Sequence, residues 1–204
     1  VPRRRLPLRR AALSPPAGGA RAATPRTVRP VAGLLAALLL ATPARADDGG
    51  WRYYGGDAGG SHYSPLRLID RTNVGSLRVA WEYRTGELDR HPDRKAFASF
   101  HATPILLPPE AGGSLAFCTP FNRIVALDPA TGTERWVHDP ALELGPVGTR
   151  YNCRGIAYWA DRTAPRDRAC AHRLFMGTTD LRLIAVDARS GRPCADFGRD
   201  GTVD

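Results

Sequence analysis

A short pattern that occurs twice constrains the fold of this chain more than any other feature. Residues 124–136 read Ile-Val-Ala-Leu-Asp-Pro-Ala-Thr-Gly-Thr-Glu-Arg-Trp, and residues 183–191 read Leu-Ile-Ala-Val-Asp-Ala-Arg-Ser-Gly. When the two copies are aligned without a gap, the Ala, Asp and Gly of the first copy meet those of the second. Repeats of this kind indicate a stacked or radial architecture.

Each copy has the chemistry of a β-hairpin. The run at residues 124–127 is short and rich in β-branched side chains, which suits a strand that is buried on both faces. Asp128 and Thr131 can bond nearby backbone groups, and Gly132 tolerates a positive φ, so this stretch predicts a hairpin loop. Trp136 follows on the outgoing strand, where its large apolar ring can wedge between neighbouring sheets.

A hairpin with two apolar faces cannot bury both of them alone. It requires similar units beside it, and the four-stranded blades of a β-propeller, arranged around a central channel, provide them. The alternative interpretation is that two unrelated hairpins occur by coincidence in an ordinary β-sandwich. The Ala-x-Asp-x-x-x-Gly match in register favours the propeller.

The rest of the chain after residue 50 has a strand-rich pattern. Turns rich in Gly and Pro separate short apolar runs, and no stretch of any length has helical periodicity. We therefore predict an all-β fold, with loops at residues 87–95, 137–153 and 160–171. Apart from the two repeats, the expected strands cover residues 77–83, 102–107, 114–119, 155–159 and 173–176.

The first 46 residues differ in kind from the rest. Residues 1–46 hold nine Arg and no acidic residue, and an apolar run follows at residues 31–41. Ala44-Arg-Ala46 then forms a small-x-small site, and the combination is typical of a secretory signal that is cleaved after Ala46. An uncleaved membrane anchor is the alternative, although the run is short for a permanent span. We expect a leader at residues 1–46 and a periplasmic segment at residues 47–204.

The charge of the chain belongs to this leader. The whole chain has 29 Lys and Arg against 20 Asp and Glu, a net charge of +9. Because nine of the Arg lie in the leader, the remainder is balanced and offers no basic stripe for a phosphate backbone. The composition argues against a nucleic-acid partner.

The four cysteines suit an exported protein. They are Cys118, Cys153, Cys170 and Cys194, and export permits disulfides among them. Four cysteines allow three full pairings. We favour Cys170–Cys194, because these two flank the strand pair of the second repeat. No Cys-x-x-Cys spacing exists and the five His are scattered, so no metal site is assigned.

Several blocks together resemble one known family. They are Trp-Arg-Tyr-Tyr-Gly-Gly from residue 51, Trp-Glu-Tyr-Arg-Thr-Gly from 81, Cys-Arg-Gly-Ile-Ala-Tyr-Trp from 153 and Thr-Thr-Asp-Leu-Arg-Leu-Ile-Ala-Val-Asp from 178. From residue 51 to 204 the chain resembles the pyrroloquinoline-quinone (PQQ)-dependent dehydrogenases of the glucose, quinate and polyol branch. The resemblance implies an eight-bladed propeller with tryptophan-docking repeats. It also implies PQQ over the channel, with a divalent ion, commonly Ca²⁺, beside it.

The same resemblance implies which residues bind the cofactor. Arg154 occupies the position of the family's cofactor-binding Arg, and a guanidinium can bind a PQQ carboxylate with two parallel hydrogen bonds. His101 lies in a His-Ala-Thr-Pro block that the family places near the cofactor. Thr178 and Thr179 precede the second repeat, where their hydroxyls could bond the rim of the quinone. The alternative for each is a structural role in its strand or turn.

The catalytic residues are not assigned. The family's catalytic Asp, its metal ligands and a Lys near the quinone would lie beyond Asp204, so we expect a fragment that is inactive by itself. Methanol- and ethanol-oxidising members carry two adjacent Cys before the cofactor-binding Arg, whereas here only Cys153 is present. That difference favours a sugar, polyol or cyclic hydroxy acid as substrate.

The resemblance also implies the partners. PQQ would accept a hydride from the alcohol carbon, and a respiratory quinone or a cytochrome would accept the electrons, with peripheral membrane association. The alternative function is a non-enzymatic propeller that serves as a scaffold of envelope assembly and shares the repeat. Downstream coding sequence with further repeats and a metal-binding pair would discriminate the two.

Overall fold

The computed structural model of this chain describes residues 50–204. The expected leader at residues 1–46 and its cleavage site lie outside the described residues. Within the described part, the helices are short, and none combines the length and the apolar composition that a membrane span requires.

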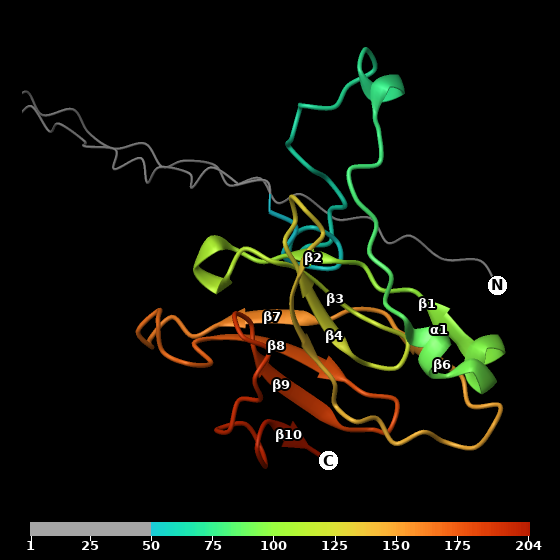
Figure 1. The fold of residues 1–204 in the computed structure, drawn as a ribbon. Helices are drawn as coiled ribbons and strands as arrows, with labels where there is room; N and C mark the ends of the chain where they lie inside the picture. Colours follow the sequence, from blue (N-terminus) through green and yellow to red (C-terminus); the bar gives the residue numbers. More distant parts are fainter. Residues whose placement is uncertain (1–49) are drawn as a thin grey trace, which may run out of the picture. The chain divides into compact units, whose positions relative to one another are not determined.

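Two four-stranded antiparallel sheets form the body of the described chain (Figure 1). The first consists of β2 (Ile105–Leu106), β3 (Leu115–Cys118), β4 (Ile124–Leu127) and β5 (Glu134–His138), hydrogen-bonded in that order. The second consists of β7 (Ala157–Ala160), β8 (His172–Gly177), β9 (Leu183–Asp187) and β10 (Thr202–Val203), also in chain order. We call them the first and second blade. The strands expected at residues 102–107, 114–119, 155–159 and 173–176 are confirmed as β2, β3, β7 and β8.

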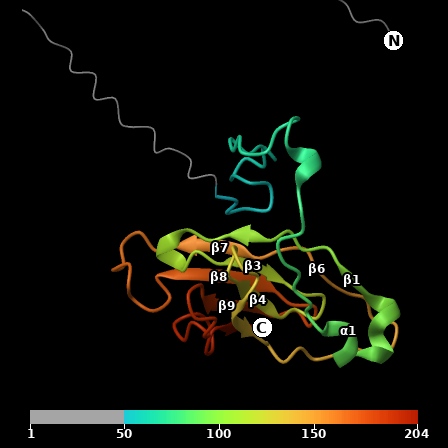
Figure 2. The ribbon, with the colours of Figure 1, turned by 45° about the horizontal axis from the view of Figure 1, so that its top comes forward.

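A small third sheet, not hydrogen-bonded to either blade, lies at their side, on the right of Figure 1 and Figure 2. In it, β1 (Ala98–Phe100) pairs in parallel with β6 (Tyr151–Cys153). The loop that the sequence predicts at residues 137–153 therefore ends in a strand. This ladder joins segments that are far apart in the chain.

Two local expectations are wrong. The strand expected at residues 77–83 is extended but unpaired, because no segment between residues 50 and 204 offers its backbone a ladder partner. The loop expected at residues 87–95 instead holds the single-turn helix α1 (Glu87–Arg90) and the start of the 3₁₀ helix η2 (Pro92–Phe97), which has Pro in its first turn. Two further 3₁₀ turns are η1 (Val74–Ser76) and η3 (Pro109–Ala111).

The main hydrophobic core lies between the two blades. The first blade contributes apolar side chains from β2, β3 and β4, and the second contributes them from β8 and β9. The buried set includes Ile105, Ala116, Cys118, Ile124, Leu174, Met176, Ile184 and Val186. Each large aliphatic side chain in such a cluster stabilises the fold by about 1.5–3 kcal/mol relative to an exposed one. The blades therefore stabilise each other, as the repeat predicts.

The repeated Asp builds the same turn twice. The Asp128 carboxylate accepts hydrogen bonds from the backbone N–H groups of Ala130 and Thr131, at 2.9 and 3.0 Å. Asp187 accepts equivalent bonds from the N–H groups of Arg189 and Ser190. In both turns the Gly N–H donates to the Asp carbonyl at 2.8 Å. A hydrogen bond from Arg135 lowers the pKa of Asp128 to about 2, so this carboxylate is ionised throughout the neutral range.

The repeated Gly receives a tryptophan ring from the preceding segment. Gly132 has a φ of +71°, and a Cβ atom added to it would lie 2.5 Å from the ring of Trp81. Gly191 has a φ of +70°, and its Cβ atom would overlap the ring of Trp136 in the same way. Only glycine permits both the positive φ and this close approach. Trp136 on β5 of the first blade thus docks on the β9–β10 connection of the second, which confirms its expected wedge position.

We predict that Gly191→Ala destabilises the full-length protein by about 2–4 kcal/mol, because the methyl group adds overpacking against Trp136 to the strain of a positive φ. Gly86→Ala is the matched control, since Gly86 has a φ of +68° and no atom within 4 Å of its added Cβ. The control should cost about 1 kcal/mol from backbone strain alone. Urea unfolding measures both. Equal losses in the two variants would show that the ring contact contributes nothing.

Candidate functional site

The small β1–β6 sheet brings two of the predicted site residues together. Its ladder pairs Phe100 with Cys153, and the next residues along the two parallel strands are His101 and Arg154. The Thr103 N–H donates to the Arg154 carbonyl at 3.3 Å, which continues the contact beyond the ladder. Both side chains are exposed. An imidazole and a guanidinium therefore lie at one end of the same two-stranded ladder.

Arg154 also lies at the same end of the second blade as Thr178. Strands β7 and β8 are antiparallel and pair Ala157 with Phe175; Arg154 comes three residues before β7 begins, and Thr178 comes directly after β8 ends. A hollow beside the second blade is lined by Arg154 and by the glycines that follow it and precede Thr178. Arg154 thus neighbours His101 along the ladder and shares an end of the β7–β8 pair with Thr178, whereas no hydrogen bond within residues 50–204 joins Thr178 or Thr179 to His101 or Arg154.

Thr178 closes the turn between β8 and β9. Its hydroxyl accepts a hydrogen bond from the Arg182 N–H at 3.0 Å and donates one to the Asp180 carboxylate. Thr119 in the β3–β4 turn accepts the equivalent bond from the Arg123 N–H, also at 3.0 Å. A Thr-x-x-x-Arg turn, residues 119–123 in the first copy and 178–182 in the second, therefore precedes each copy of the repeat and belongs to it. In this structure the Thr178 hydroxyl is engaged by its own turn.

Thr179 links the two blades through Asn122. The Asn122 side-chain oxygen accepts hydrogen bonds from the Thr179 N–H at 2.8 Å and from the Thr179 hydroxyl at 2.9 Å. Asn122 is almost completely buried and has a φ of +62°, a conformation that Asn tolerates better than most residues. The β3–β4 turn thereby holds the β8–β9 turn at the predicted site.

An ion pair next to Thr179 holds the loop that leads to β6. Arg182 contacts Asp180 at 2.7 Å and donates to the Pro140 carbonyl at 3.0 Å, while the Glu143 N–H donates to Asp180 at 3.0 Å. Burial acts to raise the pKa of Asp180, but the hydrogen bonds from Arg182 and Thr178 outweigh it and lower this pKa to about 2. The pair is therefore charged throughout the neutral range.

A second, buried ion pair was not found by sequence reasoning. Arg123 contacts Glu87 at 2.9 Å and also donates to the Thr85 carbonyl at 3.3 Å. Glu87 is 2% exposed, so the pair is held away from water. The sequence holds one signal for this pair. Arg123 occupies the same position of the extended repeat as Arg182, which also forms an ion pair. Breaking a buried pair by removing one partner is costly, because the other charge is left uncompensated.

Two disulfides fasten the described chain. Cys170–Cys194 confirms the favoured pairing, and the second disulfide joins Cys118 to Cys153. Cys118 ends β3 of the first blade, and Cys153 ends β6, directly before Arg154. This disulfide thus joins the first blade to the residue directly before Arg154.

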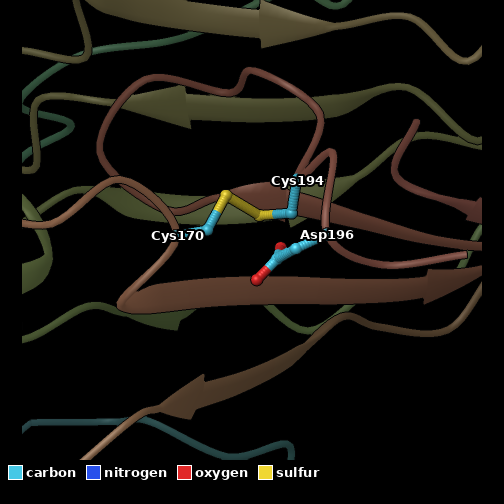
Figure 3. Close-up of side chains that lie close together, drawn as sticks. All are labelled: Cys170, Cys194 and Asp196. Atoms are coloured by element: carbon cyan, nitrogen blue, oxygen red, sulfur yellow. A yellow bond between two sulfur atoms is a disulfide. The ribbon is translucent and has the colours of Figure 1, made fainter. Parts of the chain in front are cut away.

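One group of potential metal ligands occurs in the described part of the chain. Figure 3 shows Asp196 beside the bonded sulfur atoms of Cys170 and Cys194. Neither sulfur is a thiolate, and the Asp196 carboxylate contacts Arg173 at 2.6 Å. The group is therefore a disulfide with a neighbouring ion pair.

Comparison with known proteins places this arrangement in a family. The family model described as "Glucose/ethanol/alcohol dehydrogenase, beta-propeller domain", the PQQ family, matches residues 51–204. The chain belongs to the PQQ-dependent β-propeller dehydrogenases. The predicted family is confirmed, and the two blades are blades of this propeller region.

Characterised members resemble this PQQ-family chain at about a third identity. The quinoprotein glucose dehydrogenase A of Acinetobacter calcoaceticus is 35% identical over 164 residues, which cover 75% of this chain and 20% of that protein. The glycerol dehydrogenase large subunit of Gluconobacter thailandicus is 37% identical over 80% of this chain and 21% of its own length. The quinate/shikimate dehydrogenase of Acinetobacter baylyi is 34% identical over 75% of this chain and 20% of its own length. The chain spans about a fifth of the length of these relatives.

Solved structures support the fold. The quinohemoprotein alcohol dehydrogenase of Comamonas testosteroni superposes with a TM-score of 0.52 at 23% identity, over 75% of this chain and 19% of that one. At this identity the likeness concerns the fold alone.

The residues at the site fit a carboxylate-bearing planar cofactor such as PQQ. Arg154 has no hydrogen bond or ion pair from its guanidinium to any residue between 50 and 204, and its side chain is exposed. A Cβ atom added to Gly155 or Gly177, which line the hollow beside it, would meet no atom within 4 Å. An unpaired guanidinium next to open backbone is suited to bind a carboxylate with two parallel bonds.

We predict that Asn122→Ala destabilises the full-length protein by about 2–3 kcal/mol, because it removes the acceptor for both Thr179 bonds and places Ala at a positive φ. Leu181→Ala is the matched control. Leu181 occupies the same position of the second turn, with a φ of +69°, and is 89% exposed. This control should change stability by less than about 0.5 kcal/mol. Calorimetry measures both, and an equally mild effect of Asn122→Ala would contradict the proposed link between the blades.

Proposed function

We propose that this chain forms the first blades of a quinoprotein dehydrogenase that oxidises a sugar, a polyol or a cyclic hydroxy acid. Three relatives of about a third identity are named for glucose, glycerol and quinate or shikimate, which share a secondary alcohol or hemiacetal C–H bond. The observation that carries the proposal is the exposed Arg154 directly after β6, whose guanidinium has no partner among residues 50–204, in a chain of the PQQ family.

In this proposal Arg154 binds a PQQ carboxylate and sets the position of the ring. His101 lies beside it, directly after β1, where an imidazole can donate a hydrogen bond or stack on the ring. Thr178 and Thr179 form the rim of the site through the turn and the Asn122 link. PQQ, when bound, accepts the hydride of the substrate C–H bond. The proposal assigns no Ca²⁺ ligand and no general base among residues 50–204.

We further propose that the complete propeller has eight blades. The extended segment at residues 77–83 supports additional blades, because Trp81 docks on Gly132 as Trp136 docks on Gly191. Trp136 lies on β5, the last strand of the first blade. Because Trp81 is its counterpart, residues 77–83 correspond to the last strand of a preceding blade. Leu77 and Val79 in this segment are 53% and 87% exposed. A further sheet would cover them.

The location and the electron acceptor complete the proposal. The leader at residues 1–46 supports export to the periplasm, where disulfides such as Cys118–Cys153 are stable. We propose that a respiratory quinone or a cytochrome accepts the electrons, at the surface of the membrane.

The test is reconstitution of the full-length apo-protein with PQQ and Ca²⁺. We expect PQQ-dependent reduction of an artificial dye with glucose, glycerol or quinate. Arg154→Ala should weaken PQQ binding by about 10- to 150-fold, because a charge-assisted contact of about 1.5–3 kcal/mol is lost. Arg154→Lys should recover only part of it, since an ammonium cannot form the two parallel bonds.

The matched control is Arg150→Ala, which removes an exposed arginine just before β6. Its PQQ affinity should equal that of the unmodified protein. Unchanged affinity in Arg154→Ala would remove Arg154 from the site. Absence of PQQ-dependent dye reduction with every substrate of the three classes would contradict the proposed activity.

We predict that the exported protein begins at Asp47, because the Ala44-Arg-Ala46 site follows the apolar run. N-terminal sequencing of protein from the periplasmic fraction measures this. A mature chain that retains residues 34–40 would show that the run is an anchor instead of a cleaved signal.

A further inference from the structure

The backbone that carries Arg154 depends on a small number of contacts. Strand β6 has three residues and, within residues 50–204, pairs only with the three residues of β1, outside both blades. The side chains of β6 alternate, so that Tyr151 and Cys153 are buried while Asn152 and Arg154 are exposed. Tyr151 packs against Phe121 of the β3–β4 turn, with ring centroids 4.8 Å apart. Tyr151 thus fixes the start of β6.

The end of β6 is fixed by a covalent bond. Cys153 is bonded to Cys118, which is completely buried, ends β3 and pairs with Ile124 in the first blade. The Cα atoms of the two cysteines are 5.9 Å apart. Because Arg154 is the next residue and its guanidinium has no partner between residues 50 and 204, the backbone at Cys153 decides where that guanidinium can reach.

We propose that the Cys118–Cys153 disulfide is a positioning device for Arg154, so that the affinity for PQQ depends on the redox state of this one disulfide. The inference rests on the proposed function of Arg154 as a carboxylate ligand. Reduction would add two electrons and two protons, giving two thiols, while a dithiol such as dithiothreitol becomes its cyclic disulfide. The freed end of β6 would then hold Arg154 less well, and PQQ would have to order it on binding.

The second disulfide is a matched control. Cys170–Cys194 closes a sequence separation of 24 residues, against 35 for Cys118–Cys153, so the two have similar effects on the entropy of the unfolded chain. Cys170 precedes β8 and Cys194 follows β9, which places this bond at the opposite end of the second blade from Gly177 and Leu183. Neither cysteine is next to Arg154 in the chain, and neither lines the hollow beside it.

The first experiment is a double-mutant cycle read by PQQ titration of the full-length apo-protein with Ca²⁺. Cys118→Ala/Cys153→Ala should weaken PQQ binding about 10-fold, within the range for a charge-assisted contact. The same double change in an Arg154→Ala background should weaken binding less than about twofold, because the disulfide acts through Arg154. Cys170→Ala/Cys194→Ala should leave PQQ affinity unchanged in both backgrounds.

The outcomes separate this inference from the proposed function. If Arg154→Ala alone leaves the affinity unchanged, the role of Arg154 fails. If Arg154→Ala weakens binding but the Cys118–Cys153 change does not, or weakens it equally in both backgrounds, only the positioning inference is overturned. Equal losses from the two disulfide variants would show a general effect on folding instead.

A second experiment needs no cysteine variant to fold. By linkage, a disulfide that raises PQQ affinity must itself be harder to reduce when PQQ is bound, by the same factor. Equilibrium titration with dithiothreitol, read by mass spectrometry of labelled thiols, should show about 10-fold protection of Cys118–Cys153 by PQQ. Arg154→Ala should abolish this protection, and Cys170–Cys194 should show none. Equal protection of both disulfides, or of neither, would overturn the inference.

Discussion

The contact between a tryptophan ring and a glycine of the next sheet is the interaction on which the rest of the structure depends. Trp81 lies on Gly132 and Trp136 lies on Gly191, and in both cases the glycine could not carry a Cβ atom. The positive φ of each glycine is produced by the Asp-x-x-x-Gly turn, whose Asp caps the backbone. Turn, glycine and ring therefore form one unit, and its repetition sets the spacing between blades.

This spacing also determines where the candidate site forms. Once the blades are in contact, Asn122 in the first reaches Thr179 in the second, and the β3–β4 and β8–β9 turns are held together. The β1–β6 ladder then adds His101 and Arg154 at the same end of the sheets, and the Cys118–Cys153 disulfide fastens that ladder to the first blade. The site is thus assembled from segments that no single blade contains.

Local chemistry explains which parts could be predicted from the sequence. The two hairpins follow from Asp128, Gly132 and their second copies, because turn geometry depends on neighbouring residues. The proposed role of Arg154 was accessible only through the family resemblance. The β1–β6 ladder was not accessible, because it pairs residues 98–100 with 151–153 and leaves no local signal. The buried Glu87–Arg123 pair was also missed, because charge alone does not indicate burial and the only sequence signal was the repeat position that Arg123 shares with Arg182.

The central claim is that this end of the blades binds PQQ through Arg154. The most direct measurement is a cryo-electron microscopy or crystal structure of the full-length protein with PQQ and Ca²⁺. The account predicts a PQQ carboxylate within hydrogen-bonding distance of both terminal nitrogens of Arg154, at the end of β6. PQQ bound elsewhere, with Arg154 directed into solvent, would contradict it.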